Sequence, residues 1–267
     1  MTSNGEFNDT DSLNPQRITD LLLALGSAWR EIEILSTVDS TNAEVSRRLS
    51  SQITQSTPVI VMAEEQTQGR GRLDRTWSTP KGTGIALSFG LLADQVSGEP
   101  SALPLRIGLA ASRALAKVGV AISLKWPNDL VFATDDGTIR KCGGILVQQQ
   151  SGNYVVGIGI NVRENEDQLP TAIATSLLLE GHDVSRNDLI ANLIHSVESG
   201  LTLATDWLSE YVDRCISINQ EVFVSQLSGP DLVGRVNGVL ENGALLLATD
   251  SGELEITVGD VQHAAIN

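Results

Sequence analysis

Apolar residues recur at helical spacing in three long segments of the chain. The first helix is predicted over 15–25, because Pro15 opens it, Gly26 follows it as a stop signal and its apolar residues share one face. The second is predicted over 105–118, which is rich in alanine. The third opens at Ser185, with Asp188 three residues later as a capping box, and one of its faces carries Leu189, Leu193, Ile194, Val197 and Leu201.

Shorter apolar runs between these helices predict strands. We expect them over 59–64, 83–92, 121–125, 130–134, 144–149 and 154–162. Thr41 followed by Glu44 has the spacing of a capping box and predicts that a further helix begins there. Helices and strands mixed in this way indicate an α+β domain, with a mixed β-sheet flanked by helices.

The pattern changes after about Ile216. From there, short strands are predicted over 221–225, 232–240, 244–248 and 253–258, separated by tight-turn signals such as Asn242-Gly243. We therefore expect two domains, a large one over residues 1–215 and a small all-β one over residues 216–267. Residues 1–11 are polar and acidic, and we expect a disordered tail there.

Composition narrows the class of protein. Of the 267 residues, 41% are hydrophobic and 19% are charged, which is typical of a globular chain. No apolar run has the length of a membrane span and the N-terminus lacks the pattern of a secretory signal, so we expect no membrane partner. Two cysteines argue against a disulfide framework and favour a cytoplasmic location. A net charge of −15 argues against a nucleic-acid partner.

The segment Gly69-Arg70-Gly71-Arg72-Leu73-Asp74-Arg75-Thr76-Trp77 reverses this charge locally. Glycine lets backbone N–H groups approach a ligand closely, and the planar arginine fork suits phosphate and carboxylate. The segment has neither the ending of a Walker loop nor the glycine spacing of a dinucleotide fingerprint. On its own the motif is weakly specific, and a solvated basic loop that binds nothing is the alternative.

Three further motifs bring polar groups to strand ends. Lys125-Trp126-Pro127-Asn128-Asp129 places a cation near a carboxylate that could hold Mg²⁺, although Asn and Asp are also common turn formers. Lys141 stands before two glycines and a buried strand, where a lysine either binds an anion or is merely solvated. Gly157-Ile158-Gly159-Ile160-Asn161 leaves one face of a strand bare, either for a flat ligand or for a close strand crossing.

The remaining reactive side chains carry no recognisable motif. Cys142 has no histidine near it in sequence and is interpreted as a small buried residue rather than a nucleophile. His182, His195 and His263 lack metal-ligand spacing.

The order of the motifs is more specific than any one of them. Ser40-Thr41-Asn42, the Arg/Gly segment, Lys125–Asp129, Lys141 and Gly157–Asn161 together resemble the biotin–protein ligase family over about residues 38–162. The small β domain resembles that family's SH3-like C-terminal domain. The resemblance implies a class II aminoacyl-tRNA synthetase/biotin ligase-like fold followed by a small SH3-like β-barrel. It also implies ATP-dependent activation of biotin to biotinyl-5′-AMP with Mg²⁺, and transfer of biotin to a lysine of a biotin carboxyl carrier domain of acetyl-CoA carboxylase or a related carboxylase.

The resemblance also implies roles for individual residues. The catalytic residues would be Lys141, Arg70 and Arg72. Biotin would be held by Ser40, Thr41, Asn42, Gln66, Arg70, Gly71, Arg72, Ser88, Lys141, Gly144 and Gly157. ATP and the adenylate would be held by Arg72, Arg75, Trp77, Lys125, Asn128, Lys141 and Asn161, and Asp129 would be a ligand of Mg²⁺.

This chain departs from the family pattern in the Arg/Gly segment, where Leu73 stands for an arginine and Asp74 for a glycine. About thirty residues lie between the expected tail and Ser40-Thr41-Asn42, too few for a winged helix-turn-helix domain, so no repressor role is expected. A weak homodimer is compatible with the family. A lipoate–protein ligase-like enzyme and a non-catalytic biotin-binding regulator remain as alternatives.

Overall fold

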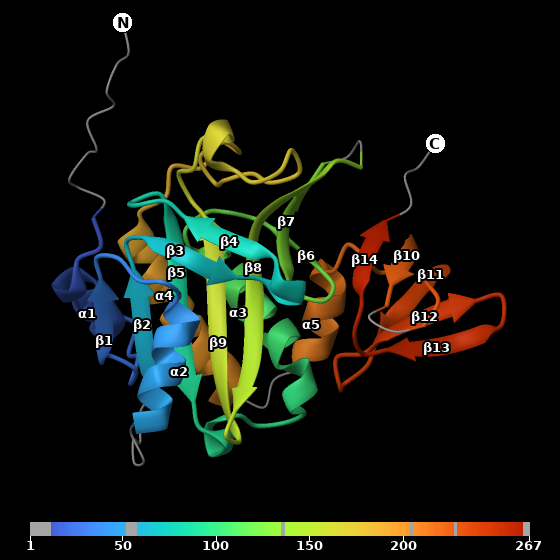
Figure 1. Cartoon of the computed structure of the whole chain (residues 1–267), viewed down its shortest axis with the longest axis horizontal. Helices are drawn as coiled ribbons and strands as arrows, with labels where there is room; N and C mark the ends of the chain where they lie inside the picture. Colours follow the sequence, from blue (N-terminus) through green and yellow to red (C-terminus); the bar gives the residue numbers. More distant parts are fainter. Residues whose placement is uncertain (1–11, 52–57, 135–136, 203–205, 227–228, 264–267) are drawn as a thin grey trace, which may run out of the picture.

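The computed structural model describes residues 12–51, 58–134, 137–202, 206–226 and 229–263. The predicted tail over residues 1–11 lies outside these ranges. Figure 1 shows a large domain beside a small C-terminal β domain. Within the described ranges, no helix combines the length and the apolar character needed to cross a membrane.

The large domain is built on a mixed sheet with the strand order β1-β2-β5-β9-β8-β7-β6. Only the pair formed by β1 and β2 is parallel among the neighbours in this order. The strands are β1 (Ile32–Leu35), β2 (Val59–Ala63), β5 (Gly84–Leu91), β6 (Ser123–Lys125), β7 (Asp129–Ala133), β8 (Ile139–Gln150) and β9 (Asn153–Asn161). The predicted α+β class is confirmed.

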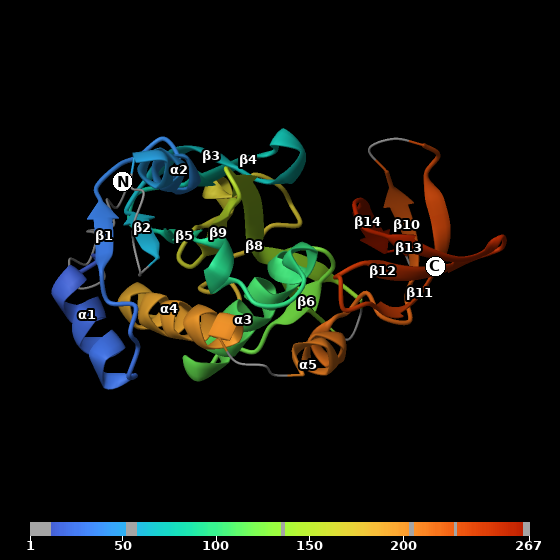
Figure 2. The same ribbon diagram turned by 90° about the horizontal axis from the view of Figure 1, so that it is seen from below.

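Helices cover both faces of this sheet. Figure 2 shows α2 (Thr41–Ser51) on one side, and α1 (Pro15–Ala24), α3 (Leu103–Lys117) and α4 (Arg186–Thr202) on the other. Helix α2 packs very close to β5. A methyl group added at Gly90 of β5 would stand only 2.9 Å from Cγ1 of Val45 in α2. A short helix, α5 (Trp207–Arg214), leads toward the small domain.

The ends of the helices mostly follow the sequence signals. Asn14 caps α1 by accepting from the backbone N–H of Arg17 at 2.9 Å, and Gly26 leaves the helix with a φ of 75°. Ser185 Oγ accepts from the backbone N–H of Asp188 at 3.3 Å at the start of α4. The N-cap of α2 is Ser40 rather than the predicted Thr41, because Ser40 Oγ accepts from the backbone N–H of Ala43 at 3.4 Å. The Glu44 side chain, predicted to complete the capping box, binds Arg47 and Arg48 instead.

The Arg/Gly segment is a hairpin rather than an irregular loop. Strands β3 (Gln66–Arg70) and β4 (Thr76–Thr79) pair antiparallel, and a short 3-10 turn over Arg72–Asp74 joins them. This hairpin lies on the same side of the sheet as α2 (Figure 2). Its strands were not predicted, because Gly, Arg and Gln give no apolar alternation.

The small domain is an antiparallel sheet with the strand order β13-β12-β11-β10-β14. Its strands are β10 (Glu221–Ser225), β11 (Leu232–Val239), β12 (Leu245–Thr249), β13 (Gly252–Ile256) and β14 (Asp260–His263). Across the described residues, β13 and β14 are edge strands that do not pair with each other, so hydrogen bonding does not close the sheet into the predicted barrel. The buried indole of Trp126 joins the domains by donating to Gly243 O at 2.9 Å.

Candidate functional site

A cavity of about 1350 Å³ lies between the face of the large sheet, the β3–β4 hairpin and the edge of the small domain. All but one of the residues assigned to the site from the sequence line it. They are Ser40, Thr41, Asn42, Gln66, Arg70, Gly71, Arg72, Arg75, Trp77, Lys125, Asn128, Asp129, Lys141, Gly144, Gly157 and Asn161. The exception is Ser88, which is fully buried beneath the cavity and supports it from below.

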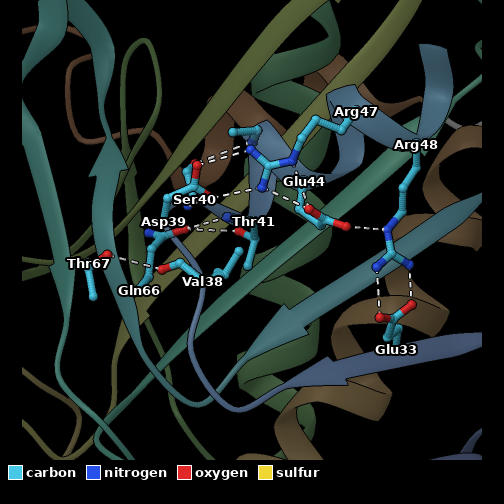
Figure 3. A network of polar contacts seen from close by, with 11 residues as sticks. Glu33, Val38, Asp39, Ser40, Thr41, Glu44, Arg47, Arg48, Gln66 and Thr67 are labelled. Carbon is cyan, nitrogen blue, oxygen red and sulfur yellow. Dashed lines mark hydrogen bonds and ion pairs between the residues drawn. The ribbon is translucent and has the colours of Figure 1, made fainter. Parts of the chain in front are cut away.

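One end of the cavity is neutral and polar, and it is formed at the N-terminus of α2. Gln66 Oε1 accepts from both the backbone N–H and the hydroxyl of Thr41, at 2.9 and 3.1 Å. Figure 3 shows these contacts beside an ion-pair network on the outer side of the helix. There Arg47 binds both oxygens of Asp39, which holds the pKa of that carboxyl down at about 2. The network fixes the chain segment that carries Ser40 and Thr41.

A second set of hydrogen bonds fixes Asn42. The Ser88 hydroxyl lies 2.6 Å from Asn42 Oδ1 and 2.7 Å from Thr41 Oγ1, and Asn42 Nδ2 donates to Gln148 Oε1 at 3.0 Å. The amide lies directly on Gly157, where a methyl group would stand 2.3 Å from Asn42 Oδ1. Gly157 therefore makes room for a site side chain, which the sequence motif alone did not reveal.

Trp77 is part of the cavity wall. Its indole lies on Gly159, where a methyl group would stand 2.5 Å from Trp77 Cε2. Lys141 Nζ lies 5.8 Å from the centroid of the same ring, within the range of a cation–π contact. The two alternate glycines of β9 thus accommodate Asn42 and Trp77 side by side.

Lys141 is held by its backbone and by its side chain. Its N–H donates to Ile173 O at 2.7 Å, and its carbonyl accepts from Thr175 N–H at 2.9 Å. Its ammonium group donates to Asp129 Oδ1 at 2.5 Å. Asn161, one of the residues predicted to hold ATP and the adenylate, is mostly buried and donates to Thr175 O at 2.9 Å. The segment 173–175 was missed as part of the site because it contains no motif.

The other end of the cavity is cationic. Arg72 donates to Asn128 Oδ1 at 3.3 Å and to Gly259 O at 3.0 Å, and Lys125 donates to Val261 O at 2.7 Å. Burial lowers the pKa of both Arg72 and Lys125, so these charges are partly shielded from water. Arg75 pairs with Asp260, while Arg70 is exposed at the rim.

The small domain contributes residues that the sequence did not indicate. Asp260, Val261, Gln262 and His263 line the cavity, and they come from β14, which was not predicted as a strand. His263 Nε2 lies 3.2 Å from Ser217 Oγ, and burial together with the charge of Lys125 lowers the pKa of His263 to about 4. The imidazole is therefore neutral at pH 7.

Cysteine chemistry does not contribute to the site. Cys142 is fully buried, and burial raises the pKa of its thiol to about 12. The interpretation of Cys142 as an inert core residue is consistent with this environment. Within the ranges that the structure describes, no three His, Cys, Asp or Glu side chains gather as a metal-binding group.

Comparison with known proteins gives two family matches. The biotin/lipoate A/B protein ligase family matches residues 34–165, and the biotin protein ligase C-terminal domain matches residues 217–264. The biotin–[acetyl-CoA-carboxylase] ligase of Mycobacterium tuberculosis is 30% identical over 270 residues, which cover 96% of this chain and 98% of that protein. The bifunctional ligase/repressor BirA of Escherichia coli is 29% identical, over 82% of this chain and 70% of its own.

A solved structure is similar over most of the chain. The biotin protein ligase from Aquifex aeolicus, in complex with biotin and ATP, superposes with a TM-score of 0.73 and 27% sequence identity. The match covers 88% of this chain and 99% of that one. Together these matches confirm the resemblance that the ordered motifs indicated.

Proposed function

Since the chain belongs to the biotin/lipoate A/B protein ligase family, we propose that it is an ATP-dependent biotin–protein ligase. It activates biotin to biotinyl-5′-AMP and transfers the biotinyl group to a lysine of a carrier domain. The M. tuberculosis relative is a biotin–[acetyl-CoA-carboxylase] ligase, the E. coli relative is a bifunctional ligase/repressor, and one similar structure holds both biotin and ATP.

The observation that carries this proposal is the polarity of the cavity. Its neutral polar end, with Thr41, Asn42 and Gln66, suits the cyclic urea of biotin, because amide and hydroxyl groups match a neutral donor–acceptor ring. Its cationic end, with Arg72 and Lys125, suits phosphate. Lys141 lies between the indole of Trp77 and the carboxylate of Asp129. One molecule with an uncharged ring at one end and a phosphate at the other would span the cavity.

In the first step, an oxygen of the biotin carboxylate attacks the α-phosphorus of ATP, and the bond to pyrophosphate breaks. Both reactants are anionic, so positive groups must offset their repulsion. Lys141, with its ammonium group in the cavity, would bind the carboxylate and an α-phosphate oxygen. Arg72 and Arg70, on the hairpin that faces the sheet, would neutralise the phosphates as charge moves toward the leaving pyrophosphate.

In the second step, the neutral amine of the carrier lysine attacks the acyl carbon of the adenylate and AMP leaves. The mixed anhydride is sensitive to water, so the hairpin over the cavity would protect it until the carrier arrives. Trp77 and the aliphatic part of Arg72 would exclude water from the acyl group.

Magnesium would enter with the nucleotide. Mg²⁺ in nucleotide sites takes one or two carboxylates together with phosphate oxygens, and Asp129 offers a carboxylate in the cavity beside Lys141. Asp129 fits this role, and the ion would neutralise charge on the departing pyrophosphate.

The carrier is proposed to be the biotin carboxyl carrier domain of acetyl-CoA carboxylase or of a related carboxylase. Support comes from the M. tuberculosis relative, which is a biotin–[acetyl-CoA-carboxylase] ligase. The two cysteines are free and buried, which suits a reducing compartment such as the cytoplasm.

The matched family includes lipoate ligases, so a lipoate–protein ligase is the second candidate. The purified chain would be incubated with ATP, Mg²⁺, an apo carrier domain and either labelled biotin or labelled lipoate. We expect labelling of the carrier by biotin and not by lipoate. Labelling by lipoate alone would establish the second candidate, and biotin binding without transfer would indicate a non-catalytic regulator.

A further inference from the structure

The side-chain amide of Asn42 is held between two strands of the large sheet. On the side of β5, Asn42 Oδ1 accepts from the Ser88 hydroxyl at 2.6 Å. On the side of β8, Asn42 Nδ2 donates to Gln148 Oε1 at 3.0 Å. Gly157 of β9 lies between these two strands and leaves the room that the amide occupies. Each end of the amide therefore has its own partner.

Ser88 alone does not fix the orientation of this amide. Its oxygen lies 2.6 Å from Asn42 Oδ1 and 2.7 Å from Thr41 Oγ1, and its single proton cannot serve both at once. A hydroxyl also accepts hydrogen bonds, so Ser88 could bind either end of the amide. The amide oxygen of Gln148 can only accept, so it takes the amino end of Asn42 and leaves the carbonyl end toward β5.

Gln148 itself lies outside the cavity. Its side chain is exposed on β8, two residues beyond Leu146, which lines the cavity. Asn42, in contrast, is only 8% exposed and lines the neutral end. Gln148 therefore acts on the cavity only through Asn42.

Helix α2 has other contacts that hold it on the sheet. Val45 of α2 is fully buried and packs against Val155 of β9. Gln150, two residues further along β8 than Gln148, donates to a backbone carbonyl of α2 at 3.1 Å and to a serine hydroxyl of the same helix at 2.8 Å. The bond between Gln148 and Asn42 can therefore be removed while the helix stays in place.

We propose that Gln148 is a positioning residue for biotin, which holds the Asn42 amide with its carbonyl end toward β5 and its amino end toward β8. The cyclic urea of biotin carries both donors and an acceptor, so an amide turned the other way would face it with the wrong partner. A buried polar group left without a partner costs affinity. The inference rests on the proposed function in taking biotin as the ligand.

Isothermal titration calorimetry of the full chain with biotin tests the proposal. Gln148→Met keeps the length of the side chain and removes the oxygen acceptor, so biotin affinity should fall about three- to tenfold, as for the loss of one hydrogen bond. Gln148→Glu keeps an oxygen acceptor and should bind biotin as the wild type does. Gln148→Lys offers only donors and should weaken binding at least as much as Gln148→Met does.

Gln150→Met is the matched control, because it removes contacts between β8 and the same helix without touching Asn42. It should leave biotin affinity unchanged. In assays of pyrophosphate release, Gln148→Met should raise the KM for biotin and leave the KM for ATP unchanged. A general loss of folded protein would lower the rate without this split.

Wild-type affinity in Gln148→Met would overturn the proposal. So would an equal loss of affinity in Gln150→Met, weakened binding in Gln148→Glu, or a rise of both KM values together. A wild-type chain that binds no biotin would refute the proposed function and this inference with it. A wild-type chain that binds biotin but releases no pyrophosphate would refute the ligase activity alone, and the calorimetric comparison of the variants would still decide the role of Gln148.

Discussion

Gly157→Ala perturbs the neutral end of the cavity through one added methyl group. Gly157 pairs with Ser88 across β5 and β9, and the methyl would stand 2.3 Å from Asn42 Oδ1, well inside ordinary van der Waals contact. The amide must therefore rotate away. It would give up its contact with Ser88 at 2.6 Å and its bond to Gln148 at 3.0 Å. At about 1 kcal/mol net for each hydrogen bond, the loss of stability is roughly 2 kcal/mol.

The same displacement pushes the amide toward the space proposed for the biotin ring. A loss of 1.4 kcal/mol weakens binding about tenfold, so we expect biotin affinity to fall by about tenfold or more. Urea unfolding would measure the stability and isothermal titration calorimetry the affinity. Gly238→Ala is the matched control, since a methyl there, also on a strand, meets no atom within 4 Å. The reasoning would be refuted if Gly157→Ala bound biotin as tightly as Gly238→Ala did.

Three further predictions concern Lys141, Arg72 and Glu164. Lys141→Ala should abolish biotin-dependent pyrophosphate release, and near-normal release would remove it from the catalytic role. Arg72→Gly loses charged contacts to the adenylate worth roughly 1.5–3 kcal/mol each. The adenylate should therefore escape from the cavity and label lysines of bystander proteins. Mass spectrometry that finds biotin only on the carrier would contradict this prediction. Glu164 is 2% exposed, and burial raises its pKa from the usual 4.5 to about 7. Between these pH values the folded state keeps a proton that the unfolded state has lost, so stability falls as pH rises, by up to about 3 kcal/mol. Glu164→Gln should flatten this dependence in urea unfolding at pH 5 and pH 8, while Glu166→Gln, an exposed neighbour, should not.

The helices and the central strands were predictable because their apolar periodicity is strong. Strands β5 and β9, and helices α1 and α3, lie close to the ranges expected from the pattern. The hairpin strands β3 and β4, rich in Gly, Arg and polar residues, carry no such pattern. Strand β1 has only four residues, all half-buried, and it pairs in parallel with a strand distant in sequence.

The site was predictable where the motifs are local. What the sequence did not indicate are contacts made by the fold, such as Gln148 behind Asn42 and Asp260 beside Arg75. Asp260 lies in a different domain from Arg75, and nothing in its neighbourhood marks it as part of a cavity. Likewise, the sequence left open whether the glycines of β9 admit a flat ligand or a close strand crossing, and in the fold Asn42 lies on Gly157 and Trp77 on Gly159.

The central claim is tested most directly by pyrophosphate release from ATP by the purified chain, with biotin present and absent. The account predicts release that depends on biotin, ceases in Lys141→Ala and proceeds without a carrier, because adenylate formation precedes transfer. A chain that binds biotin yet releases no pyrophosphate, or that releases it equally well without biotin, would contradict the account.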